Sequence, residues 1–278
     1  MSTTHNRIMK RLDWMLEHSG RVTLYVLVSL ALLVLTAPIL VVTLISFNPT
    51  RTQYFPPSGI SLRWYAEFFQ TDYFVHSFFV VSLPIALVSA LIATVLGGAA
   101  AYAIVRQDIP YKNLIQSFLL IPIMIPGVII GFALLLTYGK VNLDAGYPRL
   151  ILAHSVRLIP YALLTTMASL YSFDDDLIRA ARGLGANRYE AFYKVTFPII
   201  KSGVIAGFLL SFIISFANVN ISLFLVRPGV TPLPVEIFSF LKFRTSPIIA
   251  AISTIQIFLI LVLVLIIQRL AGFESVYN

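Results

Sequence analysis

The feature that most constrains this chain is a series of long apolar runs that contain no acidic residue. They cover residues 22–50, 73–105, 113–139, 150–173, 202–226 and 245–268. A helix of about 20 apolar residues crosses the hydrocarbon core of a bilayer, and each run is long enough to do so. In lipid, backbone polar groups have to be satisfied within the segment, which favours helices. The sequence therefore predicts an all-α integral membrane protein with six transmembrane helices.

Composition supports the same class. The chain is 58% hydrophobic and 12% charged, whereas soluble domains carry roughly 25% charged residues. A net charge of +8 could indicate nucleic-acid binding. At this hydrophobicity, loops that face an anionic lipid leaflet explain the charge better, so we expect a bilayer as partner and no nucleic acid. The absence of cysteine excludes disulfides, a thiol nucleophile and a thiolate zinc site.

The distribution of Lys and Arg predicts the orientation. With the N-terminus inside, the inner segments hold 12 of these residues and the outer segments hold 7. Positive charge concentrates on the cytoplasmic side of membrane proteins. We therefore expect residues 1–21 to be a cytoplasmic N-terminal tail, or a short interfacial helix, and residues 22–278 to be the transmembrane domain. The polar interval 172–201 then lies in the cytoplasm.

That interval predicts two short helices joined by a glycine elbow. Ser172 and Asp175 have the spacing of a capping box, with acidic residues in the first turn of the first helix. Gly183 and Gly185 are expected to end this helix, because glycine tolerates a positive φ. Such a structure suits docking onto a partner, although an ordered connector is equally consistent with the physical pattern.

The second helix of the interval has its own signals. Asn187 and Glu190 have the spacing of another capping box. Pro198 is expected to end or bend the helix.

The same interval resembles a known family. Ala180-Ala181, Gly185 and Phe197-Pro198 resemble the "EAA" loop of binding-protein-dependent ABC importer permeases, and the similarity extends over most of the chain from about residue 82. The resemblance implies a type I importer fold and a coupling helix that docks on an ATPase subunit. Arg179 occupies the position of the motif's glutamate. The docking residues implied are Arg179, Ala180, Ala181, Gly183, Gly185, Ala186, Phe197 and Pro198.

Several polar and helix-breaking residues lie within the spans. Pro122 and Pro126 interrupt the third run, which indicates either a transport path or a packing kink. Arg157 in the fourth run could face a path or extend to the interface. His154 is more often a helix–helix hydrogen-bonding residue than a ligand.

The fifth run carries a polar stripe. Its members fall at i, i+4, i+7 and i+11, which places them on one face of a helix. They are therefore expected either to line a water-filled path or to form hydrogen bonds with a neighbouring helix. They are Ser211, Ser215, Asn218 and Ser222. Asn220 points elsewhere.

Two short segments are expected outside the spans. Residues 61–69 mix aromatic and charged residues and predict an amphipathic helix in the membrane interface. Residues 234–243 form a helix too short to span. The resemblance implies that this second helix covers the end of the pathway.

Missing motifs limit the function. There is no G-x-x-x-x-G-K-[ST] phosphate loop, so this chain does not hydrolyse ATP by that route, and no catalytic set, cofactor motif or metal site is evident. A secondary carrier is disfavoured, because such proteins usually bury an acidic residue in a span.

The prediction is a multi-pass permease subunit in a bacterial or archaeal inner membrane. Its partners would be two ATPase subunits, a second permease subunit and an external solute-binding protein. The resemblance is to spermidine/putrescine-type permeases and implies a polyamine-like substrate. Arg157 and the lack of acidic residues leave an anionic or zwitterionic solute, such as a phosphonate, a carboxylate or an amino-acid derivative, as the alternative.

Overall fold

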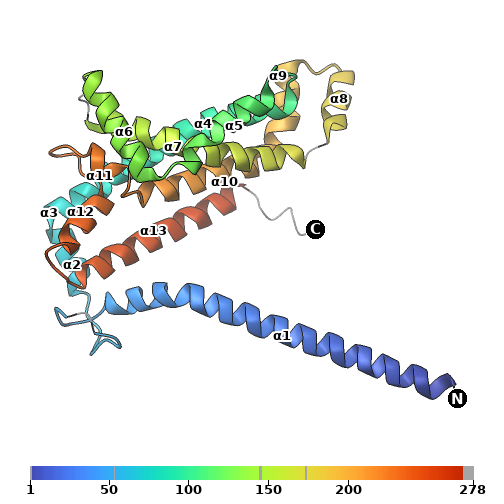
Figure 1. The fold of residues 1–278 in the computed structure, drawn as a ribbon, viewed down its shortest axis with the longest axis horizontal. Coiled ribbons are helices and arrows are strands. Elements are labelled where there is room, and N and C mark those ends of the chain that lie inside the picture. Colours follow the sequence, from blue (N-terminus) through green and yellow to red (C-terminus); the bar gives the residue numbers. More distant parts are fainter. Residues whose placement is uncertain (1, 53, 144–145, 173, 272–278) are drawn as a thin grey trace. The chain divides into compact units, whose positions relative to one another are not determined.

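The structure is a computed structural model that describes residues 2–52, 54–143, 146–172 and 174–271, with side chains from residue 20 onward except those of 175, 270 and 271. Within these residues, the regular elements are helices, as predicted. They are α1 (Ser2–Ile45), α2 (Arg63–Gln70), α3 (Asp72–Val75), η1 (His76–Ser82), α4 (Leu83–Arg106), α5 (Lys112–Met124), α6 (Gly127–Lys140), α7 (Gly146–Tyr171), α8 (Asp175–Gly183), α9 (Arg188–Ala191), η2 (Phe192–Thr196), α10 (Phe197–Phe216), α11 (Ser222–Leu225), α12 (Leu233–Leu241) and α13 (Ile248–Ala271) (Figure 1). The two η elements are π-helical.

The helices agree with the predicted membrane topology. Among the described residues, five helices are long and apolar enough to cross a membrane, or six if the bent pair α5–α6 counts as one span. The chain divides into two compact units. One comprises 1–66 with 246–255, and the other comprises 67–245 with 256–278.

In the first unit, α1 is one uninterrupted helix. The backbone therefore continues through the predicted boundary between residues 21 and 22, and the candidate span within it is Gly20–Ile45. The boundary between cytoplasmic tail and membrane stays a prediction.

The segment after α1 is held by Trp64. Its indole Nε1 donates to the carbonyl of Asn48 at 2.6 Å, and the side chain is only 1% exposed. The helix predicted at 61–69 is present as α2. Trp64 is buried within the chain, and its N–H finds a protein acceptor, as a buried tryptophan requires. The place of this helix in the membrane interface stays a prediction.

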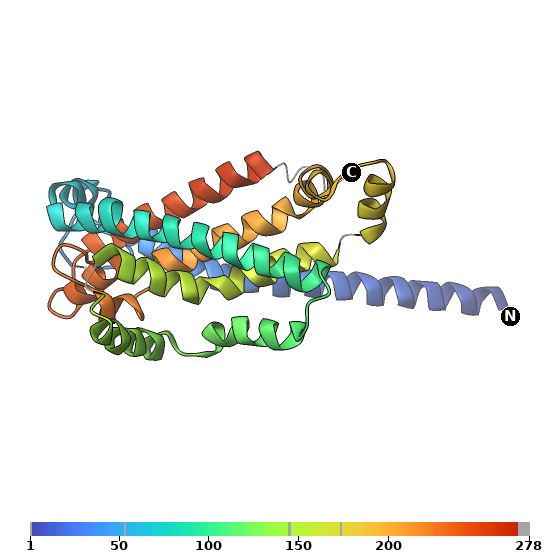
Figure 2. The same cartoon turned by 90° about the horizontal axis from the view of Figure 1, so that it is seen from above.

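In the second unit, α4, α7 and α10 pack against one another, with α7 in contact with both of the others (Figure 2). Glycines allow this close approach. A Cβ at Gly97 of α4 would lie 2.9 Å from the Cβ of Ala162, and one at Gly207 of α10 would lie 3.0 Å from the Cα of the same alanine. Ala162 is fully buried. Gly97 therefore provides a small surface for close packing of α4 on α7.

A second small-residue contact was missed in the sequence. Gly203 and Gly207 have the G-x-x-x-G spacing that lets membrane helices approach closely. A Cβ at Gly203 would overlap the side chain of Ser169 on α7. The spacing alone was a sufficient signal for this contact.

Both π-helical segments lie directly before a proline. In η1, the N–H of Leu83 bonds to the carbonyl of Phe78, five residues earlier. Pro84 has no N–H to offer the carbonyl of Val80, four residues before it. The hydroxyl of Tyr147 donates to that carbonyl at 3.2 Å. The lost hydrogen bond at Pro84 is thus accommodated by a π-helical turn and a hydrogen bond from α7.

The second π-helical segment, η2, precedes Pro198, and the N–H of Phe197 bonds to the carbonyl of Phe192. The chain stays helical from Arg188 to Phe216 and turns between α9 and α10 (Figure 1). Pro198 therefore bends the helix without ending it. The second loop helix and the fifth span, predicted as separate elements, form one continuous helix.

Candidate functional site

The predicted break in the third span is present. Helices α5 and α6 are bent by 100° where the chain is extended at Ile125 and Pro126. The guanidinium Nη1 of Arg157, on α7, donates to the carbonyl of Ile125 at 2.8 Å and also to the carbonyl of Pro122. A broken membrane helix requires partners for its freed carbonyls. Arg157 supplies these partners, and a role in a path or at the membrane interface stays a prediction.

His154, one turn earlier on α7, connects two other helices. Its Nδ1 pairs with the hydroxyl of Ser215 on α10 at 2.7 Å, and its Nε2 pairs with the hydroxyl of Ser222 on α11 at 3.0 Å. All three side chains are buried. A neutral imidazole has one donor and one acceptor nitrogen, so both of its positions are used. The expectation that His154 makes helix–helix hydrogen bonds is confirmed.

The polar stripe is not on one continuous helix. α10 ends at Phe216, and α11 begins only at Ser222. Between them, the side-chain oxygen of Asn218 accepts from the N–H of Ile221 at 3.0 Å. A local hydrogen bond of this kind competes with the helical pattern and explains the break. The predicted single fifth-span helix through residue 226 was therefore wrong.

The residues of the stripe still lie near one another, because His154 contacts both Ser215 on α10 and Ser222 on α11. Ser211 and Ser215 remain on α10, and both are buried. The hydroxyl of Ser211 has no hydrogen-bond partner among the described atoms. Asn218 is half-buried and Asn220 is exposed.

The two breaks lie against each other. A Cβ at Gly127, the first residue of α6, would lie 3.2 Å from the Cβ of Asn220, in the break after α10. One turn later, a Cβ at Gly131 would lie 3.0 Å from the Cα of Ile221. Two discontinuous helices thus meet within the second unit. Broken helices in contact are typical of substrate sites in membrane transporters.

The loop begins differently from the prediction. Asp174 is the N-cap of α8, and its carboxylate accepts from the N–H of Asp176 at 2.9 Å. The hydroxyl of Ser172 instead donates to the carbonyl of Ser169. The Ser172 capping box was therefore wrong, because Ser172 directly follows α7 and its N–H still bonds to the carbonyl of Ala168.

The elbow is present where it was predicted. α8 ends at Gly183, and Gly185 has φ +94°. The N–H of Ala186 bonds to the carbonyl of Ala181 at 3.1 Å, and the N–H of Gly185 bonds to that of Arg182 at 3.1 Å. This pair of bonds is the Schellman motif, which requires a residue that tolerates a left-handed conformation. Gly185 supplies that residue.

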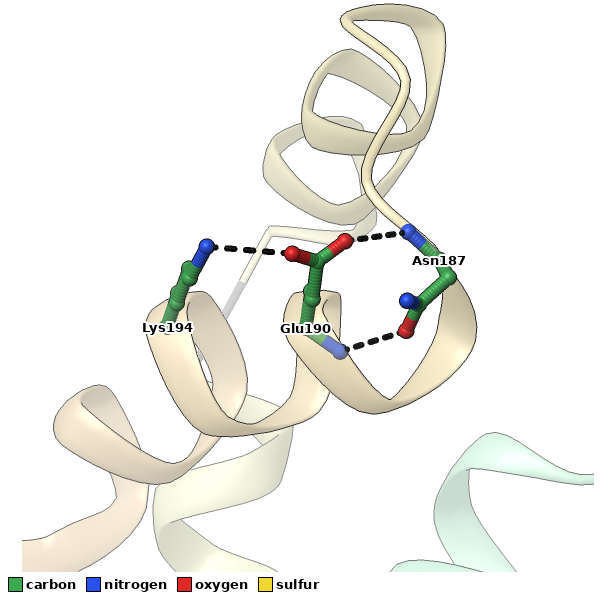
Figure 3. Close-up of polar contacts among 3 residues, drawn as sticks. All are labelled: Asn187, Glu190 and Lys194. Atoms are coloured by element: carbon green, nitrogen blue, oxygen red, sulfur yellow. Dashed lines mark hydrogen bonds and ion pairs between the residues drawn. The ribbon is translucent and has the colours of Figure 1, made fainter.

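The second capping box is confirmed (Figure 3). The side-chain oxygen of Asn187 accepts from the N–H of Glu190 at 2.9 Å. The Glu190 carboxylate accepts from the N–H of Asn187 at 3.0 Å and from Lys194 Nζ at 3.2 Å. These contacts fix the direction in which the chain leaves the elbow.

The loop presents exposed side chains at its tip. Leu184 is 90% exposed and Tyr189 is 77% exposed. Arg179 pairs with Asp176 on the same helix. Ala180 is exposed, Ala181 and Ala186 are half-buried, and Phe197 is exposed. An apolar tip held by two capped helices has the properties of a docking surface.

Comparison with known proteins decides the family. Residues 93–273 match the family described as the inner membrane component of binding-protein-dependent transport systems. This chain belongs to that family. It is a permease subunit of an ABC importer, an inner membrane component without enzymatic activity of its own.

Similar proteins of this family have been named. The chain is 33% identical to the spermidine/putrescine transport system permease protein PotC of Haemophilus influenzae, covering 83% of this chain and 89% of that protein. It is 32% identical to the putrescine transport system permease protein PotI of Escherichia coli, with 80% of each covered. It is also 32% identical to the trehalose transport system permease protein SugB of Mycobacterium tuberculosis, covering 86% and 90%.

A solved structure shares the fold of this permease. A chain of a bacterial ABC transporter for the acidic polysaccharide alginate matches with a TM-score of 0.69 at 16% identity, covering 91% of this chain and 96% of that one.

Proposed function

We propose that this permease subunit forms half of the transmembrane pathway of a polyamine importer. The observation that carries the proposal is the identity of 30–33% with relatives named for spermidine and putrescine transport. A relative named for trehalose has similar identity, so the choice of substrate needs support from the site itself.

The helix breaks provide that support. α10 ends at Phe216 beside the break, and the C-terminal end of a helix carries partial negative charge. Such half-helix ends bind cations in transporters without an acidic side chain. The charge of Arg157 is directed at the carbonyls of Pro122 and Ile125. The region is therefore compatible with the ammonium groups of a polyamine.

Uptake by the assembled importer in proteoliposomes tests the substrate class. We expect ATP-dependent accumulation of labelled spermidine or putrescine, which unlabelled polyamine competes away. Competition by a dicarboxylate, a phosphonate or trehalose would instead select an anionic, zwitterionic or sugar substrate. Uptake that persists without ATP would favour a self-contained secondary carrier.

We also propose that the polar residues at the breaks belong to the pathway. They are Ser211, Ser215, Asn218 and Ser222, with Arg157 holding the neighbouring break. The serines are buried here, so the proposal requires that they become hydrated in another state of the transport cycle.

Asn218→Leu tests the pathway role. We expect an intact complex with impaired uptake, and water-accessible cysteines at positions 211, 215, 218 and 222 during turnover but not at position 209. A complex that dissociates in detergent yet transports normally once assembled would assign these residues to helix association.

The loop 172–201 is proposed to dock on an ATPase subunit, in a complex with two ATPase copies, a second permease subunit and an external binding protein. The supports are the capped helices, the positive φ of Gly185 and the exposed Leu184. Gly185→Val should abolish substrate-stimulated ATP hydrolysis while the chain still inserts. Gly139→Val is the control outside the loop, because a Cβ there meets nothing within 4 Å and no positive φ is required.

We propose that the N-terminus and this loop lie in the cytoplasm. The chain has no cysteine, so single cysteines can be introduced directly. A cysteine at Asn187 should react with an impermeant reagent only in inverted vesicles, and one at Thr231 only in intact cells. The reverse pattern would overturn the orientation.

A further inference from the structure

A hollow of about 410 Å³ lies at the base of the loop, between the end of α4 and the helices α8, α9 and η2. Its floor contains Ala191 and Thr196, which are 3% and 1% exposed. Four arginines line it, namely Arg106, Arg179, Arg182 and Arg188, and no acidic residue is among the lining residues. The hollow therefore concentrates positive charge in one place.

The neighbouring carboxylates are already engaged. Asp174 caps α8, Asp176 pairs with Arg179, and Glu190 binds Asn187 and Lys194 (Figure 3). Asp108 is exposed and does not line the hollow. Among the described side chains, none of these acids is paired with Arg182 or Arg188.

The hollow lies beside the ends of two candidate spans. Arg106 is the last residue of the candidate span Asp72–Arg106, and its Nη2 donates to the carbonyl of Leu170 at the end of α7. With the orientation proposed above, we expect the hollow to open at the level of the lipid headgroups of the cytoplasmic leaflet. Arginine guanidinium groups bind phosphate through paired, charge-assisted hydrogen bonds.

We propose that this arginine-lined hollow binds a phosphate group, with the headgroup of an anionic phospholipid as its source. Basic pockets beside transmembrane helices on the cytoplasmic side bind such headgroups. A bound phosphate would join the loop helices α8 and α9 to the end of α4. The anionic lipid content of the membrane would then affect the stability of the loop.

Thermal melting of the delipidated full-length chain in neutral detergent tests the proposal. The probes are phosphatidylglycerol, zwitterionic phosphatidylcholine, inorganic phosphate, and oleate as an anion without phosphate. We expect phosphatidylglycerol to raise the melting temperature and phosphatidylcholine and oleate to have little effect. In the double variant Arg182→Gln/Arg188→Gln, the half-saturating lipid concentration should rise about fivefold for each arginine removed.

The control is Lys201→Gln, which removes an exposed positive charge near the N-terminal end of α10. Lys201 does not line the hollow, so this variant should leave the lipid response unchanged. If the double variant does not fold, the single variants and Arg188→Lys are titrated instead. Stabilisation by inorganic phosphate alone, lost in the same variants, supports the phosphate site with a soluble source.

Other results would overturn the proposal. These are an unchanged lipid response in the folded variants, an equal response to oleate, or no response to any phosphate probe. If no phosphate probe has an effect and the variants lose binding of the ATPase subunit, the arginines bind a carboxylate of that protein instead of a phosphate.

Discussion

The guanidinium group of Arg157 on α7 donates a hydrogen bond of 2.8 Å to the carbonyl of Ile125, in the break between α5 and α6. The only cation within the fourth apolar run thus stabilises an interruption in the third. Removing it would leave partly buried carbonyls without this donor, and a fully buried group left without a partner costs about 1–3 kcal/mol.

Arg157→Met should therefore lower the melting temperature of the purified chain. The side chains are similar in length, so the lost hydrogen bonds dominate the effect. Melting in detergent measures it, with Arg244→Met as the control at an exposed arginine. An unchanged melting temperature, together with reduced uptake by the assembled importer, would return Arg157 to a direct role in the pathway.

The hydrogen bond between His154 and Ser222 can be measured by a double-mutant cycle. His154→Leu, Ser222→Ala and the double variant should give a coupling energy of about 0.6–1.7 kcal/mol, the range found for side-chain hydrogen bonds in membranes. Ser155→Ala is the matched control, because the hydroxyl of this buried neighbour bonds to the carbonyl of Ile151 on its own helix. Coupling near zero would show that the contact is energetically neutral.

Packing between α7 and α10 predicts a steric effect. A Cβ at Gly207 would lie 2.6 Å from Thr165 Oγ1, so Gly207→Ala should destabilise the chain by about 1–3 kcal/mol through overpacking. Gly139→Ala should be neutral or slightly stabilising, because a Cβ there meets nothing within 4 Å. Folded yield and melting temperature report the difference, and equal behaviour of the two variants would refute the contact.

Glu236 on α12 predicts a pH dependence. Partial burial raises the pKa of this carboxyl above 4.5, because desolvation disfavours the charged form. The folded state therefore binds the proton more tightly than the unfolded state, and this contribution to stability is lost as pH rises through the folded pKa. Glu236→Gln should raise the melting temperature at neutral pH and have little effect below pH 4.5. A wild-type profile identical to that of the variant would contradict the raised pKa.

The fold could be predicted largely because a lipid environment restricts spanning segments to helices or closed barrels. Apolar runs without acidic residues predicted the spans, and Pro122 and Pro126 predicted the break in the third. The elbow followed from Gly185, and the second capping box from Asn187 and Glu190. These features depend on residues near each other in sequence.

The errors arose where the local structure depends on hydrogen-bond partners that are distant in sequence, or on a side chain that competes with the helix for backbone groups. Asn218 breaks the fifth span by capping Ile221, a local alternative to the helix that apolar periodicity does not reveal. The role of Arg157 depends on carbonyls more than 30 residues away in sequence, and no pattern within its own run indicates them.

The π-helical turn before Pro198 makes the region from α9 to α10 one continuous, bent helix. A flexible linker between the loop and the span would not transmit a movement of the loop. Here the helix remains hydrogen-bonded through its bend. A rotation of α9 would therefore also move the C-terminal end of α10. That end adjoins the break and the imidazole that joins α10 to α11. Rotation of α9 would thereby strain the hydrogen bonds that His154 makes to Ser215 on α10 and to Ser222 on α11.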